Sequence, residues 1–307
     1  MRHIFIINPY AGRNAFAANL RKELSQFDGF EYLILNIGQK GEEAELMEMI
    51  QSYFEDEMIR IYCCGGSGTL QNILSCINDF SKFEVAFYPC GMTNDFLKVF
   101  DAPPTAFHDL KALIEGSALS IDYLKTSCGI ALNTVSTGFD SIFLQYLERI
   151  RILSNLHYNI PYHLAMAYSM LYNNNLEYEL VIDDNQLTVV SSEIILGNGH
   201  IFSGNLHLTD PADVRDGKLS YMSIPPVSFI KRIQTILGLR SENYSQTLNA
   251  LTHGSAKKVA LHRTDGLPLT INLDGELIPD VTDCCVEVIQ KGLNLVVPKG
   301  VEVHEKS

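Results

Sequence analysis

The 307-residue sequence has little positive charge. Its 23 lysines and arginines stand against 36 aspartates and glutamates, which gives a net charge of -13. Proteins that bind nucleic acids generally need a basic surface that displaces counterions from phosphates, so this balance excludes a general nucleic-acid binder. It also opposes broad electrostatic docking on an anionic membrane and leaves only transient contact through a small basic or apolar patch.

The sequence also lacks long apolar runs and cysteine spacings typical of a metal site. Near the N-terminus only residues 4–7 are continuously apolar, which is too short for a signal peptide or a membrane-spanning helix. The seven cysteines include no C-x-x-C pair, and the adjacent pairs Cys63-Cys64 and Cys284-Cys285 lie in apolar stretches. We therefore expect reduced core thiols and a cytoplasmic location.

Hydrophobic residues make up 46% of the chain, enough for a substantial core. From residue 1 to about residue 122, short apolar runs alternate with helix-length segments. The expected strands are 4–7, 32–35, 58–64 and 85–88, and the expected helices are 16–24, 42–54 and 70–77. This alternation predicts a parallel sheet with helices on both faces, whose ligands bind beyond the carboxyl ends of the strands. The turns 8–12, 65–69 and 89–95 each follow an expected strand and can converge on one crevice.

After residue 122 the pattern changes to many short strand-like pieces separated by Asp-Gly and Asp-Asn turns. Two helical inserts, 141–171 and 227–237, interrupt these pieces. We expect an N-terminal α/β domain over 1–122 and a C-terminal β-sandwich over 123–290, with the final segment 291–307 returning to the first domain. The sequence shows no internal repeat, low-complexity run or obvious linker.

The stretch CCGGSGTL, residues 63–70, carries three glycines between an expected strand and an expected helix. Such a turn can place bare backbone N–H groups at a helix N-terminus, where the partial positive charge suits a phosphate. Glycine allows both positive φ angles and close backbone approach. The alternative is a tight turn without a ligand, because the stretch matches neither the Walker A loop nor the G-x-G-x-x-G pattern.

Further motifs follow one another in order along the chain. They are Asn8-Pro9 with Gly12, the stretch 89–96 (PCGMTNDF), Thr137-Gly138-Phe139-Asp140, Pro211-Ala212 with Asp216-Gly217, and Asp274-Gly275-Glu276. Together with GGSGT at 65–69, they resemble the motifs of the diacylglycerol kinase and sphingosine kinase family, which is related to the NAD kinases. The resemblance spans nearly the whole chain. It implies a nucleotide-binding α/β domain, a β-sandwich with a lipid pocket, and a cleft where the γ-phosphate of ATP meets a lipid hydroxyl.

The resemblance also implies roles for individual residues. The residues expected to bind ATP are Asn8, Gly65, Gly66, Ser67, Gly68, Thr69, Gly91, Met92, Asn94 and Asp95. Glu276 is expected to be the general base, with Asp274 beside it orienting the nucleotide or a metal. From these two residues alone, an Asp-Gly hairpin turn with solvated carboxylates is the alternative.

Asp213, Asp216 and the backbone carbonyl of Lys218 match the place where bacterial relatives hold a structural Mg²⁺, an ion that prefers oxygen ligands. An ordinary Asp-Gly turn is again the alternative. Asn94 and Asp95 could also cap the helix that follows them. ATP and Mg²⁺ are thus the expected cofactors, and a lipid is the expected substrate.

The sequence departs from the family pattern at two positions of the ATP site. Ser67 stands where the signature has an aspartate, and Met92 stands where it has a threonine. One lost transition-state contact can reduce a rate by about 10²- to 10³-fold, so weakened activity is a prediction. Ser67 or Thr69 could instead cap the following helix. Because the downstream carboxylates remain, a working or weakened kinase is favoured over an inactive one.

Three functions stay open. They are an ATP-dependent lipid kinase, a non-catalytic lipid- or nucleotide-binding relative, and a kinase for a soluble acceptor. An apolar channel in the second domain would favour a lipid, and a polar pocket would favour a nucleotide acceptor. The tyrosines, leucines and methionines of 141–171 form either ordinary core or a wall for acyl chains. Homodimer formation also stays open.

Overall fold

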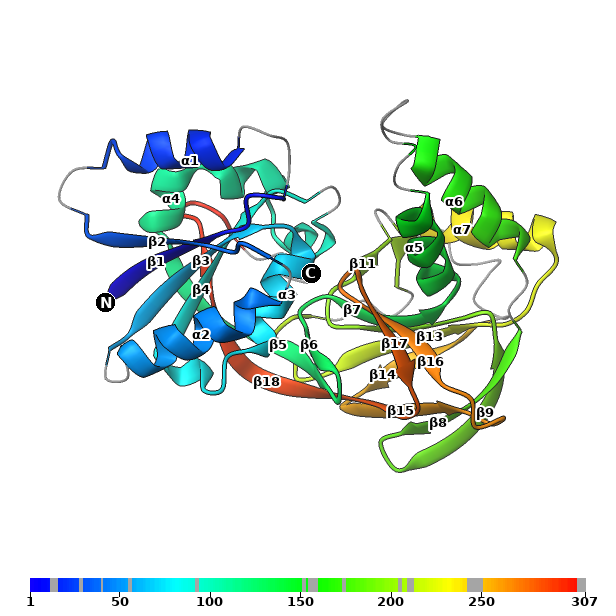
Figure 1. The fold of residues 1–307 in the computed structure, drawn as a ribbon. Coiled ribbons are helices and arrows are strands. Elements are labelled where there is room, and N and C mark those ends of the chain that lie inside the picture. The colour runs from blue at the N-terminus through cyan, green and yellow to red at the C-terminus, as the bar shows by residue number, and fades with distance from the viewer. Residues whose placement is uncertain are drawn as a thin grey trace. The chain divides into compact units, whose positions relative to one another are not determined.

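The computed structural model describes residues 1–11, 16–27, 30–39, 41–54, 57–91, 94–150, 153, 160–172, 175–203, 206–208, 213–241 and 251–302. The chain divides into two compact units (Figure 1). Unit 1 comprises Met1–Tyr123 with Ile289–Ser307, and unit 2 comprises Leu124–Val288. The long strand β18 (Cys284–Val297) passes from the second unit into the first.

Unit 1 is a parallel sheet with helices on both faces, which confirms the predicted α/β fold (Figure 1). Its parallel strands lie in the order β2 (Tyr32–Asn36), β1 (Arg2–Ile7), β3 (Ile59–Gly65), β4 (Phe83–Pro89) and the end of β18, which also pairs with β5 (Ser117–Thr126). The helices are α1 (Phe16–Leu24), α2 (Glu42–Tyr53), α3 (Ser67–Ser75) and α4 (Leu110–Ile114), with 3₁₀ turns η1 (Phe80–Lys82), η2 (Asp95–Val99) and η3 (Pro104–His108). Every residue of β3 is buried, as expected for a parallel strand covered on both faces.

The strand order places a ligand crevice at one edge of this sheet. From β1 the chain goes to β2 on one side, and it later returns to β3 on the other side. Crevices in open α/β sheets form at such a reversal, outside the carboxyl ends of the strands. The turns that follow β1, β3 and β4 therefore lie at the same edge.

Unit 2 is a β-sandwich, as predicted. One sheet has the order β14 (Thr252–Ala256), β13 (Leu219–Ile224), β10 (Glu193–Gly197), β7 (Thr134–Gly138), β16 (Leu269–Leu273) and β17 (Glu276–Val281). The facing strands are the start of β18, β15 (Lys258–Arg263), β8 (Leu176–Ile182) and β9 (Asn185–Ser191), and shorter strands are β6 (Gly129–Ala131), β11 (Ile201–Phe202) and β12 (Leu206–His207). Leu180 and Val259 from one layer share a buried core with Ile194 and Ile271 from the other.

Three helices lie against one side of the six-stranded sheet: α5 (Phe139–Arg149), α6 (Ile160–Leu171) and α7 (Phe229–Arg240) (Figure 1). The first helical insert thus contains two separate helices. Within the part of the chain that the structure describes, no helix is both long enough and apolar enough to span a membrane.

Candidate functional site

Hydrogen bonds join the three turns at the carboxyl ends of the unit 1 strands. Asn8 Nδ2, after β1, donates to Thr69 Oγ1, after β3, at 2.9 Å. The backbone N–H of Asn8 donates to the carbonyl of Cys64 at 3.0 Å, and that of Cys90 donates to the carbonyl of Gly65 at 2.7 Å. The turns therefore form one continuous structure.

The glycines of this edge allow close backbone approach. None of Gly65, Gly66, Gly68 and Gly91 has a positive φ angle. A Cβ atom on Gly65 would lie 2.7 Å from the Thr69 side chain, and one on Gly91 would lie 3.3 Å from the Gly66 Cα. Glycine is needed here because two turns pack together at backbone distance.

Helix α3 begins at Ser67, three residues earlier than predicted, and Gly66 is its N-cap. The prediction that Ser67 or Thr69 caps the helix is wrong, because no side chain makes a capping hydrogen bond and Thr69 Oγ1 accepts from Asn8 instead. An uncapped first turn leaves backbone N–H groups and the positive end of the helix dipole for an anion. This helix end can bind a phosphate.

Asn94 adds a buried oxygen atom beside this helix end. Its backbone is left-handed with φ 45°, its side chain is 9% exposed, and its Nδ2 donates to the carbonyl of Gly91 at 3.0 Å. Asn94 Oδ1 is buried and has no hydrogen-bond partner. Asp95 forms an ion pair with Lys98 at 2.6 Å, and neither Asn94 nor Asp95 caps η2 with its side chain. Met92 lies outside the described residues.

In unit 2, Asp274 occupies the tight turn between β16 and β17. Asp274 and Gly275 have φ angles of 50° and 97°, as in the type I′ turns that suit hairpins. The Asp274 carboxylate accepts backbone N–H bonds from Leu132 at 2.6 Å, from Asn133 at 3.1 and 3.2 Å, and from Thr134 at 2.7 Å. These bonds use both carboxylate oxygens, so Asp274 fixes the chain before β7, and its role with nucleotide or metal stays a prediction.

Asn272 and Asp140 support the same turn, although sequence reasoning gave neither residue this role. Asn272 Oδ1 accepts the N–H of Gly275 at 2.8 Å, and Asn272 Nδ2 donates to Asp140 Oδ2 at 2.6 Å. Both side chains are buried. The available signals were Asn272 inside the strand Leu269–Leu273 and the place of Asp140 in the motif 137–140. This network holds the turn from which Glu276 begins β17.

A narrow apolar slot lies between α5, α7 and the adjoining strands. Its lining residues include Phe139, Ile142, Phe202, Ile236, Leu239 and Glu193. Glu193 is 3% exposed; its Oε2 accepts the N–H of Asp140 at 3.0 Å, and its Oε1 is buried without a partner. Burial first, and the Asp140 carboxylate second, raise the pKa of Glu193 well above its ordinary value. The raised pKa favours the protonated form of Glu193 in the wall of this slot.

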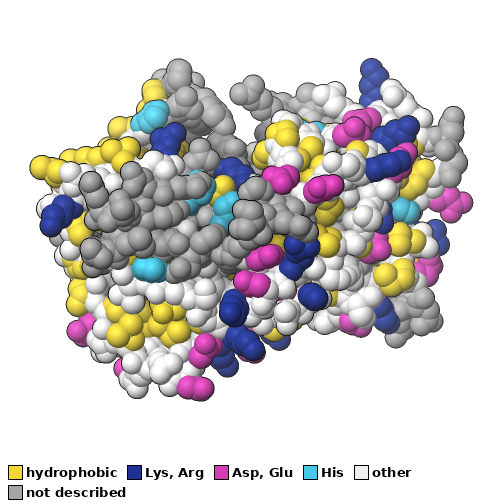
Figure 2. Space-filling view, turned by 180° about the vertical axis from the view of Figure 1, so that it is seen from behind, with side chains coloured by type: hydrophobic (Ala, Val, Ile, Leu, Met, Phe, Trp, Pro, Cys, Tyr) yellow, Lys and Arg dark blue, Asp and Glu magenta, His cyan; other side chains and the backbone are white. Residues whose placement is uncertain are grey.

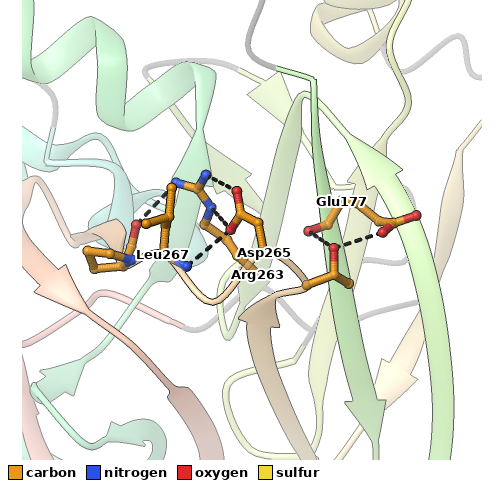
Figure 3. Close-up of polar contacts among 6 residues, drawn as sticks. Glu177, Arg263, Asp265 and Leu267 are labelled. Atoms are coloured by element: carbon orange, nitrogen blue, oxygen red, sulfur yellow. Dashed lines mark hydrogen bonds and ion pairs between the residues drawn. The ribbon is translucent and has the colours of Figure 1, made fainter.

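A second hollow, of about 380 Å³, lies beside α5 and α6. Tyr146 and Tyr168 line it and stack with ring centroids 4.1 Å apart, so these residues of the predicted acyl wall belong to a largely polar cavity. Figure 3 shows that the guanidinium of Arg263, which also lines it, is bound by Asp265 at 2.9 and 2.5 Å. Arg263 therefore has its charge already paired.

The residues predicted to bind Mg²⁺ form two small turns. Asp213 Oδ1 accepts the N–H of Arg215 at 3.0 Å, and Asp216 Oδ1 accepts the N–H of Lys218 at 2.9 Å. Each carboxylate has a second oxygen that could approach a cation, but no cluster of three or more His, Cys, Asp or Glu side chains occurs among the described residues. These bonds match the turn alternative, and the metal site stays a prediction.

Comparisons with known proteins agree with this arrangement. The model of the family described as "Diacylglycerol kinase catalytic domain" matches residues 2–126, and the model described as "YegS C-terminal NAD kinase beta sandwich-like domain" matches residues 133–301. The chain belongs to the diacylglycerol kinase family. This assignment confirms the resemblance found in the motifs.

Relatives and solved structures of similar proteins carry matching names. A "Putative lipid kinase" of Staphylococcus aureus is 25% identical over 80% of this chain and 79% of its own, and one of Staphylococcus haemolyticus is 23% identical over 80% and 78%. The crystal structure of "a putative diacylglycerol kinase" from Bacillus anthracis is 18% identical, covers 96% of each chain and has a TM-score of 0.71. At that identity, the structure shows a shared fold.

Replacing Asp274 by Asn should destabilise unit 2 by about 2 kcal/mol or more, because an amide has only one acceptor oxygen for several buried N–H donors. Urea unfolding followed by circular dichroism measures the loss. The control is Asp280→Asn, on the exposed end of the same hairpin. An Asp274→Asn protein that unfolds like the wild type would contradict the structural role.

Replacing Glu193 by Gln should stabilise the protein increasingly as the pH rises. The folded state keeps the Glu193 proton, whereas the unfolded chain releases it above its ordinary pKa of 4.5, so wild-type stability falls with pH from there. The Gln variant has no such loss, and the two proteins should converge below this pH. Urea unfolding at several values between about pH 4 and pH 8 checks this, with the exposed Glu148→Gln as the control. A difference that does not change with pH would contradict a neutral Glu193.

Proposed function

We propose that this protein is an ATP-dependent lipid kinase that transfers the γ-phosphate of MgATP to a lipid hydroxyl such as that of diacylglycerol. The observation that carries the proposal is the uncapped start of α3 at Gly66 and Ser67, beside the bare backbone of Gly91. A helix end of this kind binds the triphosphate by backbone N–H groups, which need no particular side chain. This explains how binding could survive the exchange of the signature aspartate for Ser67.

In the proposed reaction, Glu276 takes the proton from the lipid hydroxyl as the oxygen attacks the γ-phosphorus. The new O–P bond forms while the bond to the β-phosphate oxygen breaks, so the products are a phosphorylated lipid and ADP. The turn held by Asn272 and Asp274 would fix where Glu276 stands. Mg²⁺ supplied with ATP would neutralise phosphate charge.

The apolar slot supports a lipid acceptor over a soluble nucleotide. Aliphatic and aromatic side chains from α5, α7 and the adjoining strands line it, and the raised pKa of Glu193 favours the neutral form of that residue. An acyl chain gains free energy by leaving water for such a surface. A charged nucleotide would lose hydration there, and the Arg232 guanidinium in the lining already donates to the carbonyls of Met170 and Tyr172.

A non-catalytic relative is the second candidate, and Ser67 favours it. A serine hydroxyl cannot replace the charge-assisted contact of an aspartate with metal-bound triphosphate. Asp274 does not evidently replace the missing aspartate, because its carboxylate already accepts hydrogen bonds from backbone N–H groups. Low wild-type activity is therefore the expected outcome.

With ATP, Mg²⁺ and mixed micelles containing diacylglycerol, the wild type should form a phosphorylated lipid. Glu276→Gln should lower kcat by about 10²-fold or more because the base is lost, whereas Ser67→Asp should raise the rate by restoring the charge. Asp280→Asn is the control on the same strand. Mass spectrometry of the extracted lipids measures the product.

Each alternative predicts a different pattern in that assay. No product from the wild type, with product from Ser67→Asp, would establish the non-catalytic relative. Phosphorylation of a soluble nucleoside in place of any lipid would contradict a lipid acceptor.

A further inference from the structure

Helices α6 and α7 expose an unusual number of large apolar side chains. On α6 and the residue after it these are Ile160, Tyr162, Leu164, Tyr168, Leu171 and Tyr172, and on α7 they are Phe229, Ile230, Ile233 and Leu237. Leu171 is 74% exposed, Ile230 is 69% exposed and Leu237 is 56% exposed. Scattered exposed apolar residues are normal, but a contiguous group marks an interaction site.

These residues form one surface, which we call the α6–α7 face: the exposed side chains of 160–172 and 229–240. The buried guanidinium of Arg232, on α7, donates to the carbonyl of Met170 at 2.7 Å and to that of Tyr172 at 3.0 Å. These bonds join the end of α6 to the beginning of α7. Figure 2 shows hydrophobic side chains along the upper left edge of the molecule, the side on which the two helices lie in that view.

The charge of the α6–α7 face is opposite to that of the whole chain. Neither α6 nor α7 contains an aspartate or a glutamate, although the protein has a net charge of -13. Lys231 and Arg240 are exposed on α7, and His163 is exposed on α6. The combination of basic and large apolar side chains is typical of helices that lie in the interface of an anionic membrane.

Helix α7 also lines the apolar slot. Ile236 and Leu239, from α7, and the exposed Tyr172, which follows α6, are among its lining residues. A lipid that leaves a bilayer under the α6–α7 face would therefore meet slot-lining side chains of α7 and the ring of Tyr172. The exposed side chains would contact the membrane first, and the slot-lining side chains would then contact the lipid that leaves it.

We propose that the α6–α7 face docks on the surface of an anionic lipid bilayer. The apolar side chains enter the interface, and Lys231 and Arg240 lie at the level of the anionic headgroups. A second copy of the chain fits this face less well, because symmetric pairing would bring basic side chains together with no acidic residue of either helix to neutralise them. The negative charge of the remaining chain keeps the attachment reversible.

The docking proposal rests on the proposed lipid kinase function, which requires access to a lipid. Its test, however, needs neither ATP nor turnover. Co-sedimentation measures binding of the full-length protein to vesicles of phosphatidylcholine alone or of phosphatidylcholine and phosphatidylglycerol in equal parts. The wild type should bind the anionic vesicles more tightly and lose that advantage at high salt. Equal binding to both kinds of vesicle, or binding to neither, would overturn the proposal.

Variants locate the surface. The double variant Ile230→Asp with Leu237→Asp should weaken binding by about tenfold or more, because it removes two apolar side chains from the interface. Lys231→Glu should weaken binding to anionic vesicles by about fivefold or more. Tyr53→Asp is the matched control, since Tyr53 is an 81% exposed aromatic residue on α2 of unit 1. Equal losses in the control and in the double variant would overturn the assignment to this face.

Two further measurements separate the alternatives. Light scattering without lipid tests for a dimer, and a wild-type dimer that the double variant converts to monomer would overturn membrane docking. Turnover of a short-chain, water-soluble diacylglycerol should be the same in the double variant and the wild type. If no protein turns over any lipid while vesicle binding still follows the predicted pattern, the kinase proposal fails and the docking proposal stands.

Discussion

The close approach of two backbone turns, at Gly66 and Gly91, is the constraint on which the proposed phosphate site depends. The strand order of unit 1 brings the ends of β1, β3 and β4 to one edge, and the glycines let the turns pack there without side chains between them. The start of α3 consequently stays uncapped. Strand order, missing side chains and an open helix end together form the site at which we propose a polyphosphate binds.

The second unit uses its carboxylates for different purposes. Asp274 is bound by backbone N–H groups, Glu193 has a raised pKa in an apolar wall, and Asp140 connects the two regions through Asn272 and the Glu193 oxygen. Glu276 is the carboxylate that the proposed chemistry uses. The family signature includes an aspartate at the position of Ser67. Without that carboxylate, the proposed reaction depends on Glu276 as its base and on backbone N–H groups to bind the phosphates.

The pattern of apolar runs along the chain was enough to predict the fold class of both units. The order of short motifs was enough to predict the family. Local detail was not predictable, because it depends on partners that only the tertiary structure supplies. Ser67 has the side chain of an N-cap residue, but Gly66 takes that position, and no local pattern indicates that the Asp274 carboxylate binds the backbone before β7. Nothing near Glu193 in the sequence indicates that Asp140 lies beside it.

Equilibrium binding of ATP to the wild type and to Gly66→Asp tests the central claim most directly. Aspartate is a favourable N-cap residue and suits the extended backbone at Gly66, so the variant should fold, but its carboxylate would repel phosphate from the start of α3. The account predicts saturable ATP binding by the wild type and a loss of about tenfold or more in the variant. A wild type that does not bind ATP, or a folded Gly66→Asp protein that binds it equally well, would contradict the account.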